Sequence, residues 1–354
     1  MPRTSRVASH ACSFVALLLV LGAAPASADL SVGVSWSNFH EERWKTDEAA
    51  IVAELERQGA RYVSADAQSS PEKQASDIES LIARGVDALI VLPHDAQALI
   101  PTVRSAQREG IPVIAYDRLI EIPGVLYVSY ENREIGRMQA RELQRLVPKG
   151  RYVFIKGSLQ DPNANVVHGG QLDILQAAMD RGDIEIVGDQ YVDGWLPELA
   201  QRTMEQILTA NGDAVDAVAC SNDGMAGGVV AALSAQGLAG IPVSGQDADH
   251  AALNRIARGT QSVTVWKDVR DLGRHAAAAA LQLARGENVQ SVEGHIVWSG
   301  GAGGIEMDAV LLKPVSITKQ NLDLVIDAGW VPREVVCRSL PSDAKVPACK
   351  AAAN

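Results

Sequence analysis

The stretch that decides the fold is GIPVIAYDR at residues 110–118, which recurs as GIPVSGQD at residues 240–247. In each copy a Gly-Ile-Pro turn leads into a few strand-like residues, and the strand ends on an acid. These two acids are Asp117 and Asp247, which stand 130 positions apart. The repeat indicates that the chain contains two segments built in the same way.

A second matched pair precedes these copies: VDALIVLPHD at residues 86–95 and VDAVACSND at residues 215–223. Two consecutive strands that recur at nearly constant spacing are typical of an internal duplication. Polar residues follow the carboxyl end of each strand. Because ligands bind at the carboxyl ends of parallel strands, we expect two similar lobes with a binding site between them.

Strand-like and helix-like segments alternate from Leu30 onward, as expected of parallel sheets covered on both faces. Ser70-Pro71 has the form of a helix N-cap followed by proline at the first helical position. We also expect strands over 241–245 and 309–318, and an irregular tail after Trp330. The predicted fold class is α/β, with two similar Rossmann-like lobes that contain parallel sheets and are linked by a hinge.

A chain of 354 residues is long enough for two domains, each with its own core. We place crossings between the lobes near residues 131, 267 and 315. The glycine-rich segment at 297–307 is expected to be a loop and has no assigned role. The predicted divisions are a signal peptide over 1–28, an N-terminal lobe of 29–131 plus 268–315, a C-terminal lobe of 132–267 plus 316–330, and a tail over 331–354.

The N-terminal residues have the pattern of an export signal. Arg3 and Arg6 precede an apolar run over Phe14–Ala24 that is too short to span a bilayer. Ala26-Ser27-Ala28 then matches the small residues of a cleavage site. We therefore expect cleavage before Asp29 and release of the mature chain into the periplasm.

Cysteine usage and net charge restrict the possibilities further. Cys337 and Cys349 lie close together in a polar tail, and in an oxidising compartment we expect them to pair. Cys220 lies in an apolar strand and is interpreted as an inert core thiol. The formal net charge of −11, without a run of basic residues, argues against nucleic acid as a partner.

Motifs of the common enzyme classes are absent from the sequence, including the G-x-S-x-G elbow, H-E-x-x-H, C-x-x-C and the phosphate-binding loop. Two facing carboxylates such as Asp117 and Asp247 are nevertheless compatible with a glycosidase. With Arg118 beside one and Lys267 near the other, both would stay ionised, whereas a glycosidase acid needs a raised pKa. The residues therefore favour binding over catalysis, with no metal or cofactor.

The positive signal is a set of polar and aromatic residues at the predicted strand ends. Charged and amide side chains suit hydroxyl groups, which both donate and accept hydrogen bonds. A flat indole can cover the apolar face of a sugar ring. The candidate ligand-binding residues are Arg43, Trp44, Asp117, Arg118, Asn163, Trp195, Asn222, Asp247 and Lys267.

Purely structural roles are the alternative for several of these residues. Asp117, Asn222 and Asp247 are also residue types that form turns after strands. Arg43 has an alternative interpretation as a solvated helix residue paired with a neighbouring glutamate, and Trp195 as a hydrophobic staple at a helix start.

Several stretches resemble one family, the periplasmic sugar-binding proteins of ABC transporters with the ribose-type two-lobed fold. AYDR at 115–118 and GQDAD at 245–249 resemble pentose and hexose binders in general. ERW at 42–44, VDGWLPE at 192–198 and SAQGLAG at 234–240 resemble the xylose-binding members. The resemblance covers roughly residues 30–330 and does not extend to the tail.

The resemblance implies a monomeric binding protein that captures a monosaccharide, D-xylose first, between two closing lobes. It implies that Arg43, Asp117 and Arg118 bind hydroxyls and that Trp44 stacks on the sugar, while the remaining candidates act from the other lobe or the crossing. The implied partners are a membrane permease and its ATPase. Alternatives are another pentose or hexose (ribose, arabinose, glucose) bound for sensing or chemotaxis, a sugar-responsive repressor, and a secreted glycosidase.

Overall fold

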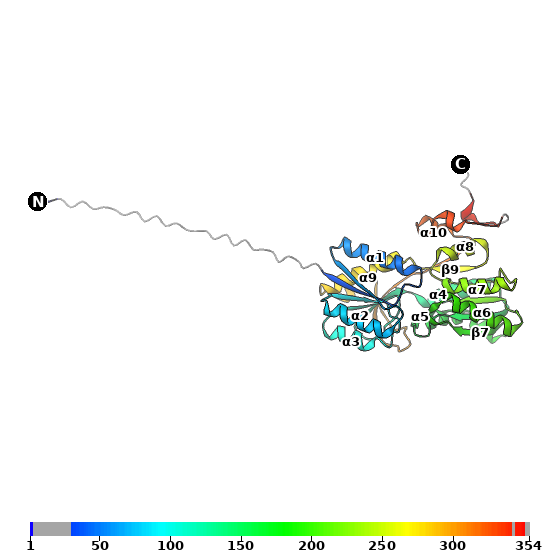
Figure 1. The fold of residues 1–354 in the computed structure, drawn as a ribbon, viewed down its shortest axis with the longest axis horizontal. Coiled ribbons are helices and arrows are strands. Elements are labelled where there is room, and N and C mark those ends of the chain that lie inside the picture. Colours follow the sequence, from blue (N-terminus) through cyan, green and yellow to red (C-terminus); the bar gives the residue numbers. More distant parts are fainter. Residues whose placement is uncertain (3–29, 342–343, 351–354) are drawn as a thin grey trace.

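The computed structural model describes residues 1–2, 30–341 and 344–350. The predicted signal peptide therefore lies, for residues 3–28, outside the described part of the chain. Figure 1 shows two α/β lobes side by side, with the helices α1 (Arg43–Arg57) and α9 (Val269–Ala284) in one lobe and α6 (Pro197–Asn211) and α7 (Asp223–Ala235) in the other. Within the described ranges, no helix combines the length and apolar character needed to cross a bilayer.

The first lobe is built on a seven-stranded sheet in the order β10-β11-β5-β4-β3-β1-β2. Neighbouring strands are parallel, except that β10 is antiparallel to β11. The central strands are buried along their whole length, as expected of apolar strands covered on both faces. The strands are β1 (Ser31–Trp36), β2 (Arg61–Asp66), β3 (Ala88–Val91), β4 (Val113–Tyr116), β5 (Val125–Tyr130), β10 (His295–Trp298) and β11 (Met307–Leu312).

Four helices cover this sheet: α1 (Arg43–Arg57), α2 (Pro71–Ala83), α3 (Ile100–Arg108) and α9 (Val269–Ala284). Residues of α1 and α9 share one core cluster, and residues of α2 and α3 share another. The predicted start of α2 is confirmed, because Ser70 Oγ accepts a bond from Lys73 N at 3.1 Å. Gly273 lets α9 approach α1 closely, since a Cβ there would lie 2.8 Å from the Cβ of Ala50.

The second lobe contains a three-stranded parallel sheet in the order β7-β6-β8. Its elements are β6 (Gly150–Lys156), β7 (Ile184–Tyr191) and β8 (Ala217–Cys220), with α4 (Asn132–Leu146), α5 (Pro162–Asp180), a 3-10 turn η1 (Asp193–Trp195), α6 (Pro197–Asn211), α7 (Asp223–Ala235) and α8 (His250–Arg258). Together the lobes confirm the predicted α/β class with mostly parallel sheets.

The strand predicted over 241–245 is wrong. This segment makes only isolated bridges, from Val243 to Val218 and from Gln246 to Val265. Pro242 has no N–H to give to a ladder, and the backbone turns at Asp247, where φ is 98°. The segment still runs beside β8, because Val218 N donates to Pro242 O and Ser244 N donates to Val218 O.

The single strand predicted over 309–318 is two strands. β11 ends at Leu312 in the sheet of the first lobe, and β12 (Val315–Thr318) pairs antiparallel with β9 (Val263–Trp266). Pro314 lies between them and interrupts the run. The chain therefore leaves the first lobe's sheet at this point; the domain boundaries themselves stay a prediction.

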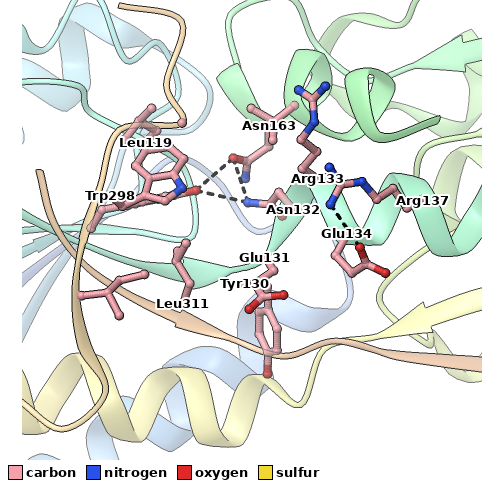
Figure 2. A pocket seen from close by; sticks show the side chains of 14 residues that line it. Leu119, Tyr130, Glu131, Asn132, Arg133, Glu134, Arg137, Asn163, Trp298 and Leu311 are labelled. Atoms are coloured by element: carbon pink, nitrogen blue, oxygen red, sulfur yellow. Dashed lines mark hydrogen bonds and ion pairs between the residues drawn. The ribbon is translucent and has the colours of Figure 1, made fainter. Parts of the chain in front are cut away.

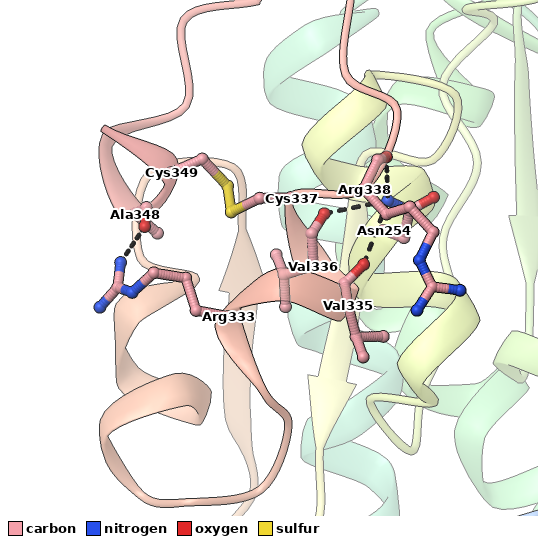
Figure 3. Close-up of a disulfide and its surroundings, with 8 residues drawn as sticks. All are labelled: Asn254, Arg333, Val335, Val336, Cys337, Arg338, Ala348 and Cys349. Atoms are coloured by element: carbon pink, nitrogen blue, oxygen red, sulfur yellow. Dashed lines mark hydrogen bonds between the residues drawn. A yellow bond between two sulfur atoms is a disulfide. The ribbon is translucent and has the colours of Figure 1, made fainter. Parts of the chain in front are cut away.

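The tail is more ordered than expected. Beyond Trp330 it contains the short helix α11 (Arg333–Val336) and a 3-10 turn over Pro347–Cys349, while the short helix α10 (Asp323–Asp327) precedes Trp330. Cys337 and Cys349 form a disulfide, which Figure 3 shows beside α8. Cys220 is a buried free thiol in β8, and burial raises its pKa.

Candidate functional site

The predicted site residues lie where elements of both lobes meet. Arg43 and Trp44 open α1, while Asp117 and Arg118 follow β4. The other lobe and its crossing contribute Asn163 from the first turn of α5, Trp195 from η1, Asn222 from the N-cap of α7, Asp247 from the turn before α8, and Lys267 from the end of β9.

Eight of the nine predicted residues line one buried cavity, here called the central cavity. The exception is Asn222, which lines a neighbouring cavity that shares Glu41, Trp195 and Asp247 with the central one. Asn222 Nδ2 still reaches Glu41 Oε2 at 3.5 Å, and its Oδ1 caps α7 by accepting from Met225 N. Three further residues line the central cavity: Glu41, Asp161 and Gln246.

Arg43 is the centre of the charge network. Its side chain is buried, and its guanidinium lies 3.1 Å from Asp47, 2.9 Å from Asp117 and 3.3 Å from Asp247. The alternative interpretation of Arg43 as a solvated residue paired with a neighbouring glutamate is therefore wrong. A planar guanidinium spreads its donors over three nitrogen atoms, whereas an ammonium has all of its donors on one nitrogen.

Lys267 provides a second cation for the two repeated acids. Its Nζ lies 2.8 Å from Asp247 Oδ1 and 3.8 Å from Asp117 Oδ2. Burial alone would raise the pKa of Asp117, but the charges of Arg43, Lys267 and Arg118 outweigh it and lower that pKa. Asp117 is thus held ionised, as expected, although Arg43 contributes more than Arg118.

The Arg118 side chain pairs with other acids than Asp117, its neighbour in sequence. Its guanidinium pairs with Glu41 at 3.0 Å and with Asp161 at 2.9 Å. Burial raises the pKa of Glu41 and of Asp161, and Arg118 opposes the shift in both. Arg118 therefore holds together two acids that come from different lobes.

The two candidate tryptophans differ in their surroundings. Trp44 is fully buried, its Nε1 donates to Glu41 Oε1 at 3.1 Å, and the Arg43 guanidinium lies 4.3 Å from its ring centre. Trp195 is also buried, but its Nε1 has no hydrogen-bond partner among the described residues. Gly157 makes room for Trp195, since a Cβ there would lie 2.1 Å from its ring.

Three site residues have a backbone conformation that is uncommon for side chains other than glycine. Asp117 and Trp195 have φ of 59°, and Asp247 has φ of 98°. Such conformations cost free energy and are concentrated at functional sites. Asp117 and Asp247, which end equivalent segments of the duplication, share this feature.

Asn163 links the two lobes through neutral groups. Its Nδ2 donates to the main-chain oxygen of Asp117 at 3.0 Å, and its Oδ1 accepts from Tyr127 and Asn132. Ser129 Oγ also donates to the same Asp117 oxygen, at 2.7 Å. These bonds hold the strained residue Asp117 and place Asn163 against it.

A second cavity of about 310 Å³ lies on the other side of Asn163. Figure 2 shows its wall of Leu119, Trp298 and Leu311 from the first lobe, opposite Arg133 and Arg137 on α4. Its lining is mainly apolar, and Arg133 and Arg137 are already paired with Asp173. The central cavity, with its buried charges, is therefore the better candidate for a polar ligand.

Sequence reasoning missed Glu41, Asp161 and Gln246 as cavity residues. Asp161 carried a signal, because an acid before Pro162 is a helix N-cap pattern, and its side chain does accept from Asn163 N. Gln246 precedes a predicted site acid directly. Glu41 is one of two glutamates that directly precede Arg43, and nothing in the sequence indicates that it pairs with Arg118.

The arrangement is suited to binding a small polyhydroxylated molecule. Charged donors, charged acceptors, an amide and two indoles surround one buried space, and its polar atoms come from both lobes. Among the described residues, no group of three or more His, Cys, Asp or Glu side chains is arranged to hold a metal ion.

Comparison with known proteins places the chain in a family. It matches the periplasmic binding protein domain over residues 32–288. It is 40% identical to the D-xylose-binding periplasmic protein of Escherichia coli (strain K12), over 88% of this chain and 94% of that protein. The protein of the same name from Haemophilus influenzae is 38% identical, over 94% of this chain and 99% of that protein.

A solved structure of a sugar complex also has this fold. A carbohydrate transporter solute-binding protein from Chloroflexus aurantiacus, in complex with D-glucose, superimposes with a TM-score of 0.78 and is 28% identical. The match covers 87% of this chain and 98% of that one. The chain therefore belongs to the periplasmic binding protein family, whose members are solute-binding proteins and not enzymes.

Proposed function

We propose that this protein binds a monosaccharide, with D-xylose as the first candidate, in the central cavity between its two lobes. The observation that carries the proposal is the convergence of eight predicted ligand-binding residues on that cavity. Their guanidinium, ammonium, carboxylate, amide and indole groups can together donate to and accept from every hydroxyl of a sugar ring.

Two buried polar atoms of the cavity support a ligand with hydroxyl groups. Trp195 Nε1 and Gln246 Oε1 have no hydrogen-bond partner among the described residues. A buried polar group without a partner costs about 1–3 kcal/mol. A sugar hydroxyl can accept from the indole N–H or donate to the amide oxygen, so ligand binding would remove this cost.

The choice of D-xylose rests on the relatives. The two D-xylose-binding periplasmic proteins cover almost the whole chain at 38% and 40% identity. The solved structure with D-glucose is less similar in sequence and supports the sugar class rather than one sugar. Another pentose or hexose is therefore the second candidate.

Lobe closure is the mechanism that the contacts support. The side chains of the central cavity lie so close together that only about 10 Å³ remains between them, about the least that one water molecule needs. A sugar therefore enters only when the lobes separate and Arg43 parts from Asp247. Closure then buries the sugar between these charged groups.

The protein would act in the periplasm as a monomer and deliver the sugar to an ABC permease and its ATPase. Directional hydrogen bonds to buried groups would reject a sugar that lacks a hydroxyl, because the protein group left behind would be unpaired. The tightly packed cavity would also disfavour the additional CH₂OH group of glucose.

The test is calorimetric titration of the purified protein with D-xylose, D-ribose, L-arabinose and D-glucose, with tryptophan fluorescence as a second signal. We expect D-xylose to bind in the micromolar range or more tightly, and at least tenfold more tightly than the others. Preference for another of these sugars would change the assigned ligand but would still support the proposed binding site. Absence of binding by all four would contradict the proposed function.

A further inference from the structure

The corner that carries Asp247 is strained over two residues. Asp247 and the next residue, Ala248, have φ of 98° and 55°. Alanine rarely adopts this left-handed conformation, because its Cβ then lies too close to the following carbonyl oxygen. The conformation persists only where the surroundings hold it. Contacts to this corner therefore decide where the Asp247 carboxylate points.

Three polar contacts to the corner come from the second lobe and the adjoining strand β9. Asp247 N donates to Val265 O at 2.9 Å, and Ala248 N donates to Thr264 Oγ1 at 3.1 Å. Asp249 N donates to Asp223 Oδ2 at 3.1 Å. These three bonds all hold backbone N–H groups.

The fourth contact comes from the end of the chain. The indole Nε1 of Trp330 donates to the main-chain oxygen of Ala248 at 2.7 Å. Trp330 is 82 residues away from Ala248 in sequence and lies directly before the tail. Its indole is thus the group that holds the carbonyl side of the corner.

Trp330 is itself held firmly. Its main-chain oxygen lies 3.0 Å from His250 Nε2, and its main-chain N–H donates to Val325 O at 2.9 Å. Its ring packs against Trp266, at 6.1 Å between ring centres, and against the Arg270 guanidinium at 5.6 Å. Trp266 directly precedes Lys267, the cation that pairs with Asp247.

The tail behind Trp330 is tied to α8 by separate contacts. Figure 3 shows Asn254 of α8 donating to the main-chain oxygens of Val335, Val336 and Arg338, next to the disulfide. Val336, Val346 and Ala348 of the tail share a core cluster with Ala248. These contacts fix the tail but do not reach the corner through a hydrogen bond.

We propose that Trp330 is a positioning residue for the ligand site, because its indole N–H holds the Asp247–Ala248 corner and so directs the Asp247 carboxylate toward Arg43 and Lys267. The inference rests on the proposed function, since it concerns the affinity for the sugar. It goes beyond that function by giving the C-terminal segment a role in binding.

The experiment compares Trp330→Phe with Asn254→Ala by calorimetric titration with D-xylose and by thermal unfolding. Trp330→Phe keeps an aromatic ring but removes the N–H donor to Ala248. We expect its affinity for the sugar to fall about tenfold. Asn254→Ala loosens the tail but removes no hydrogen bond to the corner, so we expect a lower Tm and an affinity within twofold of the unaltered protein.

Two results would overturn the inference: an affinity of Trp330→Phe within twofold of the unaltered protein, or an equal loss of affinity in Asn254→Ala. Failure of the unaltered protein to bind any sugar would instead contradict the proposed function. The two failures are therefore distinguishable in one set of titrations.

A measurement on the unaltered protein covers the case in which Trp330→Phe does not fold. Coupling between two sites is reciprocal, so a bond that favours sugar binding must be strengthened by the sugar. We expect saturation with D-xylose to slow solvent exchange of the Trp330 indole N–H by about tenfold. An unchanged exchange rate in a protein that binds the sugar would contradict the proposed role.

Discussion

The guanidinium of Arg43 lies 3.3 Å from the carboxylate of Asp247, although 204 residues separate the two in sequence. Arg43 begins a helix of the first lobe, and Asp247 precedes a helix of the second. The same guanidinium lies 2.9 Å from Asp117. One cation of the first lobe thus faces both acids of the internal duplication, and this contact depends on how the lobes are placed.

Replacement of Arg43 by lysine tests this role. The guanidinium uses all three of its nitrogen atoms to contact Asp47, Asp117 and Asp247, and Nη2 faces both Asp47 and Asp117. One ammonium nitrogen cannot take all of these positions. Each lost hydrogen bond to a charged group is worth about 1.5–3 kcal/mol. We expect Arg43→Lys to lower the free energy of unfolding by at least about 2 kcal/mol and to weaken sugar binding more than tenfold, measured by urea unfolding and calorimetry.

Arg57→Lys is the matched control. Arg57 lies on the same helix and pairs with Glu54, but its side chain is 67% exposed. Exposed ion pairs contribute about 0–1 kcal/mol, so we expect little change in stability and none in affinity. Equal behaviour of the two lysine variants would contradict a special role for Arg43.

Gly157→Ala tests whether the position of Trp195 matters. A Cβ at residue 157 would lie 2.1–2.3 Å from three atoms of the Trp195 indole, far inside contact distance. The ring must move, and a group displaced by even a small distance no longer meets its ligand. We expect the affinity for the sugar to fall at least tenfold, together with a changed tryptophan fluorescence spectrum.

Gly182→Ala provides the comparison for that variant. Gly182 has φ of 74° and open space around it, so alanine there strains the backbone without touching the site. We expect it to cost about 1 kcal/mol of stability with unchanged affinity. If Gly157→Ala bound the sugar as well as Gly182→Ala does, Trp195 would not be a ligand-binding residue.

Asp47 predicts a dependence of stability on pH. Burial raises its pKa to about 6, against an ordinary value of 3.8, although Arg43 and Tyr116 oppose the shift. The folded state therefore keeps this proton longer than the unfolded chain does, and stability is lost as pH rises from about 4 to 6. Between pH 4.5 and 7.5 the contribution amounts to about 2 kcal/mol.

Asp47→Asn should lack this contribution. The difference in free energy of unfolding between the unaltered protein and Asp47→Asn should be about 2 kcal/mol larger at pH 4.5 than at pH 7.5. Urea unfolding at both pH values measures it. Asp173→Asn, at a surface carboxylate whose pKa is lowered by Arg133, should show almost no change over this range, because that group is largely ionised at both pH values in the folded and the unfolded chain. A pH-independent difference for Asp47→Asn would refute the assignment.

Much of the fold was predictable because hydrophobic patterns and turn residues act locally. The cap at Ser70 and the alternation of strands and helices from Leu30 onward follow from such local signals. The two wrong strands share one cause. Pro242 and Pro314 remove ladder donors, and an apolar run around a proline resembles one continuous strand until pairing partners are known.

The candidate site was predictable as a set of residues but not as a network. Strand ends indicate which residues meet at the edge of a sheet. They do not indicate that Arg43, rather than Arg118, reaches Asp117, or that Arg118 turns to Glu41 and Asp161. Ion pairs between residues far apart in sequence depend on how two lobes pack, and no local pattern encodes that packing.

The disulfide between Cys337 and Cys349 closes a short loop in the tail, which follows Trp330 in sequence. Trp330 itself contacts His250 of α8. Closing a loop of this size removes entropy from the unfolded chain, which is worth about 3 kcal/mol. If the tail unfolds together with the second lobe, the double variant Cys337→Ser/Cys349→Ser should have a free energy of unfolding lower by about 2–3 kcal/mol. The shared core of Val336, Ala348 and Leu253 makes joint unfolding the expected case.

Urea unfolding of the double variant tests this expectation. A single transition shifted to lower urea concentration, reproduced by reducing the disulfide of the unaltered protein, would agree with it. Two separate transitions with the main one unmoved would show that the tail unfolds alone and that its disulfide does not support the lobe.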